Sequence, residues 1–189
     1  MKELLLMRHG LTRENELQVI IGITDPSLSD NGKEKLYSIR ECVVKPDIVL
    51  CSELKRVRET AEILFPNSDI QAIPQLRERD FGVLEGKTLV YARETGLLQT
   101  QDETILRKNG IETPTALLSR ASQVVNYLSQ LHAKKIVVIS HRTFINYILR
   151  VMLPENKIGV IPHTHYHQIV FDLNEKIIYM KINQSWCVG

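Results

Sequence analysis

Glycine and proline are scarce in this sequence of 189 residues, which has 9 of the first and 7 of the second. Collagen-like and low-complexity chains need far more of both, so these classes are excluded. Aromatic residues make up only 6%, but a hydrophobic fraction of 43% is ample for a folded core. A chain of this length buries about 70% of its unfolded surface and needs no metal or disulfide to fold. We therefore expect one globular domain over residues 1–189.

The sequence also lacks an excess of charge of one sign. Its 24 Lys and Arg residues against 22 Asp and Glu residues give a formal net charge of +2. A nucleic-acid-binding domain carries a marked basic excess, so we predict no nucleic-acid partner. No apolar run approaches the roughly 20 residues of a membrane span. The run at 4–7 ends at Arg8, short of the about 7–15 apolar residues of a secretory signal, so we predict a cytoplasmic protein with no membrane partner.

Cysteine is rare as well. Cys42, Cys51 and Cys187 are an odd number, lie far apart and form no C-x-x-C pair. This pattern argues against a disulfide framework and favours a reducing compartment. The oligomeric state has no signature in the sequence.

Predicted strands and helices alternate along the chain. Apolar runs predict buried strands at 4–7, 47–51 and 136–140 and a weaker one at 70–73, while helical spacing of apolar residues predicts helices at 31–44, 54–64, 114–131 and 144–152. Residues 75–113 read as irregular, with a helical piece at 89–94. Two closing strands, at 168–173 and 176–182, are joined by Asn174-Glu175 and predict a hairpin. This order predicts a three-layer α/β/α sandwich around a mainly parallel sheet with one antiparallel edge strand.

Charged and imidazole side chains follow three of the predicted strands. Arg8 and His9 follow the first, Arg56 lies one helical turn beyond the second, and His141 and Arg142 follow the strand at 136–140. Ligands of open α/β sheets bind beyond the carboxyl ends of the strands. A guanidinium beside the free N–H groups of a helix N-terminus is suited to hold a phosphate. The sequence therefore predicts an anion site at this edge of the sheet.

Five ordered motifs resemble those of the histidine phosphatase superfamily, which includes the phosphoglycerate mutases. R-H-G-x-T-x-x-N is matched at 8–15, S-x-L-x-R-x-x-x-T-A-E at 52–62, L-x-E-x-[DH]-[FY]-G-x-x-[EQ]-G at 76–86 and V-x-S-H at 138–141, and the segment D-P-S-L-S-D-N-G at 25–32 resembles D-x-P-L-[ST]-x-x-G. The matches cover most of the chain, and the fold of that family agrees with the α/β prediction.

The resemblance implies a role for each of five residues. His9 matches the nucleophile, which forms a phosphohistidine and so turns one hard displacement into two easier ones. Arg8, Arg56 and His141 match a clamp for the transferring phosphoryl group, whose spread negative charge makes positioning and electrostatics the main sources of catalysis. Glu78 matches the group that gives a proton to the leaving oxygen and then activates water. The family needs no metal and no cofactor, and its substrates are small phosphorylated metabolites.

Three further residues are expected to bind substrate. Asn15 adds a donor, although asparagine is also common in turns. Gly22 lies in Ile21-Gly22-Ile23, where mutases of the family carry a Thr-Gly-Trp-like stretch, so a hydroxyl and an aromatic ring are lost. Arg142 stands where many members have glycine and places a bulky cation at the rim.

The histidines His163, His165 and His167 alternate in the sequence. In an extended segment they would line one face, where histidines of this spacing can chelate a transition metal. No carboxylate or cysteine is placed beside them and the matched family needs no metal, so no metal site is predicted. An alternative interpretation puts His163 at the border of the substrate pocket.

The leading functional hypothesis is a metal-independent phosphatase that hydrolyses small phosphomonoesters through a phosphohistidine on His9. One alternative is phosphoryl transfer of the phosphoglycerate mutase type, against which the apolar Ile21 and Ile23 argue. The other is a catalytically silent phosphate-binding module. Which phosphomonoester is the substrate is not legible in the sequence.

Overall fold

The computed structural model describes residues 1–154, 161–172 and 176–186. Its helices and strands are β1 (Lys2–Arg8), α1 (Arg13–Glu16), α2 (Asp30–Ile39), β2 (Ile48–Cys51), α3 (Lys55–Leu64), β3 (Ile70–Ala72), α4 (Leu89–Glu94), α5 (Glu103–Lys108), α6 (Pro114–Gln130), β4 (Lys135–Ser140), α7 (Arg142–Met152), β5 (Tyr166–Phe171) and β6 (Ile177–Gln184). Short 3₁₀ helices at Arg40–Cys42, Pro74–Leu76 and Gly82–Leu84 join them.

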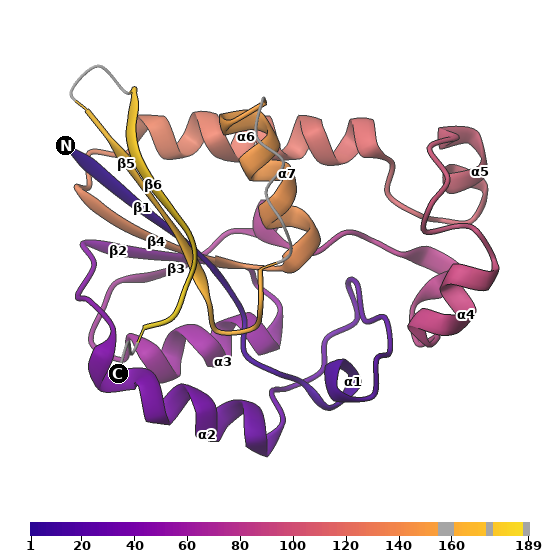
Figure 1. The fold of residues 1–189 in the computed structure, drawn as a ribbon, viewed down its shortest axis with the longest axis horizontal. Coiled ribbons are helices and arrows are strands. Elements are labelled where there is room, and N and C mark those ends of the chain that lie inside the picture. Colours follow the sequence, from indigo (N-terminus) through magenta and orange to yellow (C-terminus); the bar gives the residue numbers. More distant parts are fainter. Residues whose placement is uncertain (155–160, 173–175, 187–189) are drawn as a thin grey trace.

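The six strands form one sheet in the order β3-β2-β4-β1-β5-β6 (Figure 1). β3, β2, β4 and β1 are parallel neighbours, and β5 runs antiparallel to both β1 and β6. The predicted mainly parallel sheet with an antiparallel edge is thus confirmed. The predicted hairpin turn at Asn174-Glu175 lies outside the described residues.

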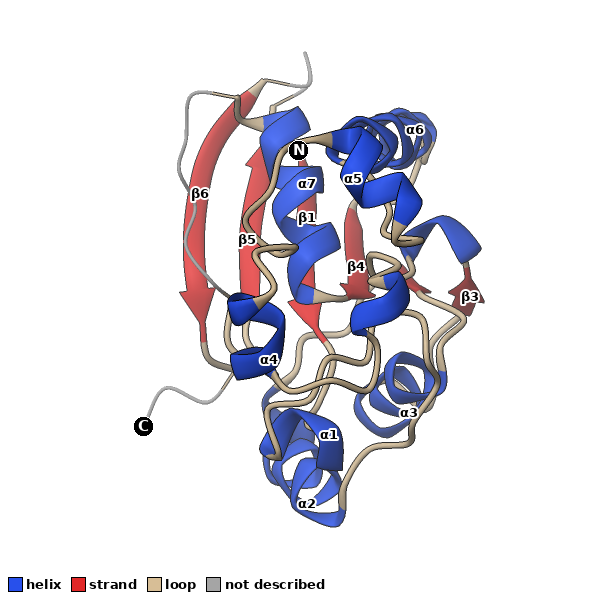
Figure 2. Ribbon diagram, turned by 90° about the vertical axis from the view of Figure 1, so that its right-hand side faces the viewer, coloured by secondary structure: helices blue, strands red, loops and turns tan. Residues whose placement is uncertain are grey.

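Helices cover both faces of the sheet (Figures 1 and 2). α6 and α7 pack on one face, in a core that includes Leu4 and Leu6 of β1. α2 and α3 pack on the other face, in a core that includes Leu5 and Met7. Because successive strand residues point to opposite faces, one continuous apolar run feeds both cores. The three-layer α/β/α arrangement is confirmed.

The structure differs from the prediction mainly in short elements. The helix expected at 31–44 ends at Ile39, and a 3₁₀ helix continues to Cys42. α1 and α5, of 4 and 6 residues, were not expected. Their signals are the capping side chains, Thr12 for α1 and Asp102 for α5.

Residues 81–111, which we call the cap region, lie beyond the carboxyl ends of the parallel strands (Figure 1). They contain α4 and α5 and share a small core of their own with the loop after α1, made of Ile20, Phe81, Leu84, Ala92, Leu106 and Ile111. The segment that reads as irregular in sequence is therefore an ordered wall beside the end of the sheet.

The sequence argument against disulfides fails at one residue. Cys42 is disulfide-bonded, whereas Cys51 is a buried free thiol. Wide spacing along the chain does not measure the distance that decides whether two cysteines pair. The cysteine pattern therefore no longer supports a reducing compartment. In the described part of the chain, no helix has the length and apolar character needed to cross a membrane.

Candidate active site

A cleft of about 170 Å³ opens where β1 and β4 end, beside the cap region. Seven of the eight residues predicted for the site line it: Arg8, His9, Asn15, Gly22, Arg56, Glu78 and Arg142. The eighth, His141, contacts two of these. A larger, mainly apolar cleft of about 660 Å³ lies at the opposite end of the sheet around Leu128 and Ile136, away from all of these groups.

His9 is held in one tautomer at the end of β1. Its side chain is buried, and its Nδ1 lies 2.6 Å from the carbonyl oxygen of Gly10. A carbonyl oxygen only accepts, so Nδ1 carries the proton and Nε2 keeps its lone pair. Burial, with the nearby His141 and Arg56, lowers the pKa of His9 well below 6.5. The imidazole is therefore neutral, with an unprotonated Nε2.

His141 is held in the opposite tautomer. Arg56 donates from Nη2 to Nδ1 of His141 at 3.2 Å, so the proton of this imidazole is on Nε2. The ring centroid of His141 lies 5.1 Å from that of His9. Burial, followed by the charges of Arg56 and Arg8, lowers the pKa of His141 well below 6.5. A neutral N–H donor thus stands beside the His9 imidazole.

Three buried donors in this cluster have no hydrogen-bond partner among the described residues: Nε of Arg8, Nε of Arg56 and Nε2 of His141. Buried polar groups are nearly always paired, because leaving one unpaired is costly. Desolvation and the charge of Arg142 lower the pKa of Arg8 to about 9, and desolvation lowers that of Arg56 to about 10. An anion placed among them would supply both the missing hydrogen bonds and the missing counter-charge.

Arg56 and Glu85 hold the loop that contains Gly22. The fully buried guanidinium of Arg56 donates to the carbonyl oxygens of Gly22 and Thr24, each at 2.7 Å. The Glu85 carboxylate accepts from the backbone of Ile23 and Thr24 at 2.9 and 3.0 Å. Gly22 has a φ of +40°, and a Cβ there would collide with the Glu85 carboxylate. The sequence motif includes Glu85, but its role as a loop anchor was not predicted.

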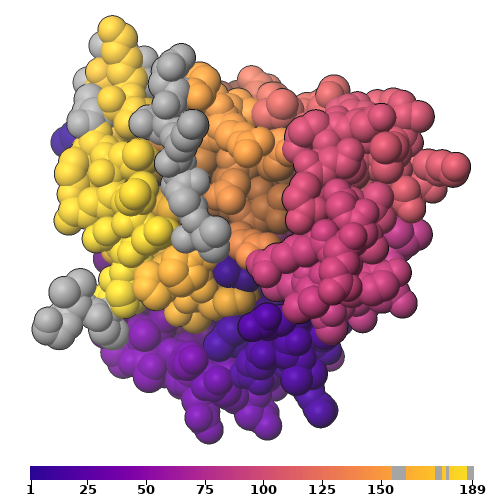
Figure 3. Space-filling model, turned by 45° about the vertical axis from the view of Figure 1, so that its right-hand side comes forward, coloured from indigo at the N-terminus to yellow at the C-terminus, as the bar shows by residue number. Residues whose placement is uncertain are grey.

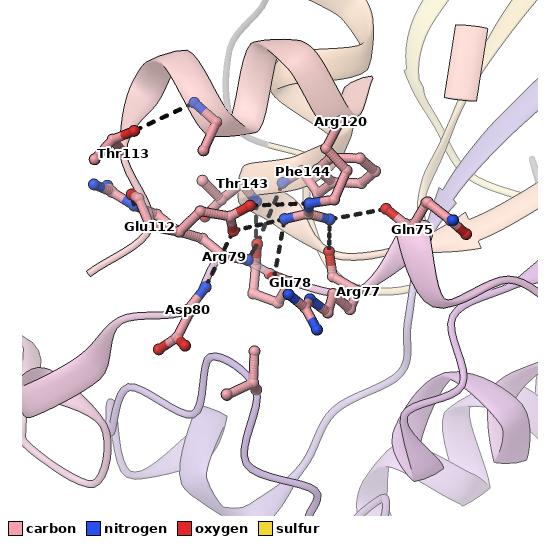
Figure 4. A network of polar contacts seen from close by, with 12 residues as sticks. Gln75, Arg77, Glu78, Arg79, Asp80, Glu112, Thr113, Arg120, Thr143 and Phe144 are labelled. Carbon is pink, nitrogen blue, oxygen red and sulfur yellow. Dashed lines mark hydrogen bonds and ion pairs between the residues drawn. The ribbon is translucent and has the colours of Figure 1, made fainter. Parts of the chain in front are cut away.

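Glu78 is fixed at the wall of the cleft (Figure 4). Its Oε1 accepts from the backbone N–H groups of Arg79 at 2.8 Å and Phe144 at 3.2 Å, and its Oε2 accepts from that of Thr143 at 3.2 Å. The N-cap residue of α7, His141, provides no side-chain cap of its own. The Glu78 carboxyl group therefore caps α7, where a negative charge is favoured by the helix dipole.

Arg120 holds the segment that carries Glu78, and sequence reasoning missed it. Its Nη1 donates to the carbonyl oxygens of Gln75 and Arg77 at 2.8 and 2.7 Å (Figure 4). Its Nε and Nη2 donate to the Glu112 carboxylate at 3.0 and 2.7 Å. The guanidinium also lies 3.9 Å from the ring centroid of Phe144. Nothing local in the sequence links α6 to residues 75–78, so no pattern could have indicated these contacts.

Asn15 and Arg142 both line the cleft, and each has a structural setting of its own. Asn15 accepts through Oδ1 from the Thr12 backbone at 3.3 Å, while Thr12 accepts from the Asn15 backbone at 3.3 Å. This capping box gives Asn15 a structural role through Oδ1 and leaves its side-chain N–H groups for a ligand. Arg142 is the first residue of α7, and its charge acts on Arg8.

The three alternating histidines do not share a face. Thr164, with a φ of +65°, turns the chain, so the extended segment begins only at Tyr166. His163 donates from Nδ1 to the carbonyl oxygen of His9 at 2.9 Å and lines the cleft, whereas His167 is fully buried in β5. The described residues contain no group of three or more His, Cys, Asp or Glu that could hold a metal ion. The condition for a common face, an extended segment through all three histidines, is not met, because the strand includes only His167.

This arrangement agrees with what known proteins show. Residues 4–176 match the histidine phosphatase superfamily (branch 1). The chain belongs to this superfamily. A broad-specificity phosphatase of Saccharomyces cerevisiae is 27% identical over 98% of this chain and 83% of its own length. A probable phosphoglycerate mutase of Proteus mirabilis is 33% identical over 70% of this chain and 61% of its own.

Solved structures of histidine phosphatases share the fold. A putative α-ribazole-5′-phosphate phosphatase from Escherichia coli superposes with a TM-score of 0.82 at 22% identity, with all of both chains covered. The resemblance read from the five motifs is thus confirmed at the level of the family and the fold. Both phosphatases and mutases occur among the relatives. The reaction of this histidine phosphatase therefore has to be inferred from the residues of its own site.

Proposed function

We propose that the protein is a phosphatase that hydrolyses small phosphomonoesters through a phosphohistidine on His9 and uses no metal ion. The supporting observation is the set of three unpaired buried donors, on Arg8, Arg56 and His141, beside an imidazole whose Nε2 is free. A phosphoryl group placed there meets a nucleophile and the donors that stabilise its charge.

The proposed reaction has two steps. In the first, the Nε2 lone pair of His9 attacks phosphorus, the ester P–O bond breaks, and the departing alcohol oxygen takes a proton from the Glu78 carboxyl group. In the second, water attacks the phosphohistidine, the P–N bond breaks, and Glu78 takes the proton that water loses. The hydrogen bond from Nδ1 of His9 to Gly10 keeps Nε2 oriented in both steps.

A trapping experiment tests this mechanism. Enzyme that has turned over a labelled phosphomonoester and is then denatured in alkali should carry base-stable, acid-labile phosphate on His9, and His9→Ala should abolish both label and turnover. The exposed His132, which lies away from the cleft that holds His9, provides the control, since His132→Ala should keep both the label and the turnover. Activity that is lost in EDTA, or retained in His9→Ala, would contradict the proposal.

The same experiment separates hydrolysis from mutase chemistry and from a silent module. A mutase passes the phosphoryl group to a second hydroxyl, so labelled phosphate would appear in another ester rather than as free phosphate. The apolar Ile21 and Ile23 favour water as the acceptor. A silent binding module would bind inorganic phosphate without any turnover.

The remaining sequence predictions belong to this proposal. The ligand is a small phosphorylated metabolite, with no nucleic-acid or membrane partner, and the site works without a cofactor. The cytoplasmic location stays a prediction, which fractionation of cells that express the protein would test.

A further inference from the structure

The cleft joins the anion site to an apolar wall. The wall consists of Val19, Ile20 and Ile21 from the loop after α1 and of Phe81, Leu89 and Leu98 from the cap region. Ile20, Ile21 and Phe81 are buried, but Val19, Leu89 and Leu98 remain partly exposed. Apolar surface that stays open inside a cleft is what a ligand with an apolar part would cover.

The two segments that form this wall are fastened to each other. The backbone N–H of Ile20 donates to Lys87 at 2.9 Å, and that of Leu89 donates to Gln18 at 2.9 Å. Figure 3 shows the pink cap region lying against the indigo N-terminal loop. The wall is therefore built into the fold rather than formed by loose side chains.

The charged groups that line the cleft are few. The lining residues among those described contribute three guanidiniums, of Arg8, Arg56 and Arg142, and one carboxylate, of Glu78. With the histidines neutral and Glu78 holding the proton that it gives to the leaving oxygen, a phosphate dianion offsets two of the three guanidinium charges, and Arg142 keeps the third. A carboxylate or second phosphate on the substrate would find only Arg142 in the lining, whereas an apolar group would find the whole wall.

We infer that the substrate is a phosphomonoester whose remaining part is mainly apolar, an alkyl or aryl group that lies against the wall made by Val19, Leu89 and Leu98. This inference rests on the proposed phosphatase function and adds the substrate class to it. It explains why the position of the mutase Thr-Gly-Trp-like stretch is apolar here, since Ile21 belongs to the same wall.

A series of n-alkyl phosphates tests the inference on the unaltered protein. Burial of one methylene is worth about 0.8 kcal/mol, so kcat/KM should rise about fourfold per added methylene until the wall is covered. The alkoxide leaving groups are chemically alike beyond ethyl, so the rise reports contact with the wall. Glycerol phosphate and 3-phosphoglycerate should be poorer substrates than alkyl phosphates of similar size.

Variants locate the effect. Leu98→Asn and Val19→Thr should flatten the alkyl series, whereas Leu118→Asn, at an exposed apolar residue of α6 outside the cleft, should leave it unchanged. The inhibition constant of inorganic phosphate, which contacts only the anion site, should be the same in all three and shows that they are folded.

The outcomes separate the inference from the proposed function. A flat alkyl series with phosphoenzyme on His9 overturns the substrate class alone. A preference for 3-phosphoglycerate that Arg142→Gln removes also overturns it, because Arg142 would then bind a second anion. No turnover and no phosphoenzyme with any ester overturns the phosphatase proposal and the inference together.

Discussion

Removal of Arg120 should weaken both the fold and the site, although this residue lies in none of the sequence motifs. Arg120 and Glu112 form an ion pair at 2.7 Å with only 11% and 13% of their side chains exposed. The same guanidinium ties down the carbonyl oxygens of Gln75 and Arg77, just before Glu78. Arg120→Ala removes the donor from three backbone carbonyl groups, those of residues 75, 77 and 78, and leaves the nearly buried Glu112 carboxylate with the backbone N–H of Asp80 in place of a cation.

The expected cost follows from this burial. Loss of one partner of a buried ion pair typically costs about 3–5 kcal/mol, because the other charge stays desolvated and unpaired. Arg120→Ala should lower the free energy of unfolding by about that amount. A shift of Glu78 by about 1 Å can lower kcat by up to 100-fold. The loss should be larger for an alkyl phosphate, which needs a proton on its leaving oxygen, than for p-nitrophenyl phosphate.

Urea unfolding and steady-state kinetics provide the two measurements. Arg107→Ala is the matched control, because Arg107 pairs with Glu103 at 2.6 Å but is 66% exposed. Exposed pairs contribute little, so this control should barely change the urea midpoint or kcat. Arg120→Lys should recover only part of the loss, since an ammonium group cannot replace the planar guanidinium fork. Equal effects of Arg120→Ala and Arg107→Ala would refute the reasoning.

Three further predictions follow from the site. Gly22→Ala should destabilise the protein more than Gly96→Ala, since both glycines have positive φ but only a Cβ at Gly22 meets the Glu85 carboxylate; equal urea midpoints would contradict this. Glu78→Gln should lower kcat about 10²–10⁴-fold with an alkyl phosphate, and it should slow the first step far less with p-nitrophenyl phosphate. Stopped-flow measurements should therefore show a burst of nitrophenol. Equal losses on both esters without a burst would show that Glu78 does not transfer the proton. Burial lowers the folded-state pKa of His163 to about 3. Below pH 6.5 the unfolded state therefore binds more protons than the folded state. The contribution of this residue to the free energy of unfolding should then fall by about 1.4 kcal/mol for each unit by which the pH is lowered. Urea titrations between pH 7 and 4 should show a slope that is smaller by this amount in His163→Gln, and an unchanged slope would refute the assignment.

Local patterns in the sequence determined most of the architecture. An apolar run with both faces buried, such as that at 4–7, has few alternatives to a central strand, because backbone groups buried on both sides must be paired in a sheet. Long amphipathic repeats such as that of α6 likewise fix a helix and its buried face. The positions of His9, Arg56 and His141 after three strands then follow, since parallel strands bring their carboxyl ends to one edge.

Only the tertiary structure determined which polar groups come within hydrogen-bonding distance of one another. Arg120 reaches Gln75 from 45 residues away, and His163 reaches His9 from 154 residues away. The disulfide at Cys42 and the turn at Thr164 belong to the same class. Propensity and periodicity act over a few residues, whereas hydrogen bonds and ion pairs form between whichever groups packing brings within about 3 Å. The tautomer of His141 and the anchoring of Glu78 depend on such contacts, so they exist only once the chain is folded.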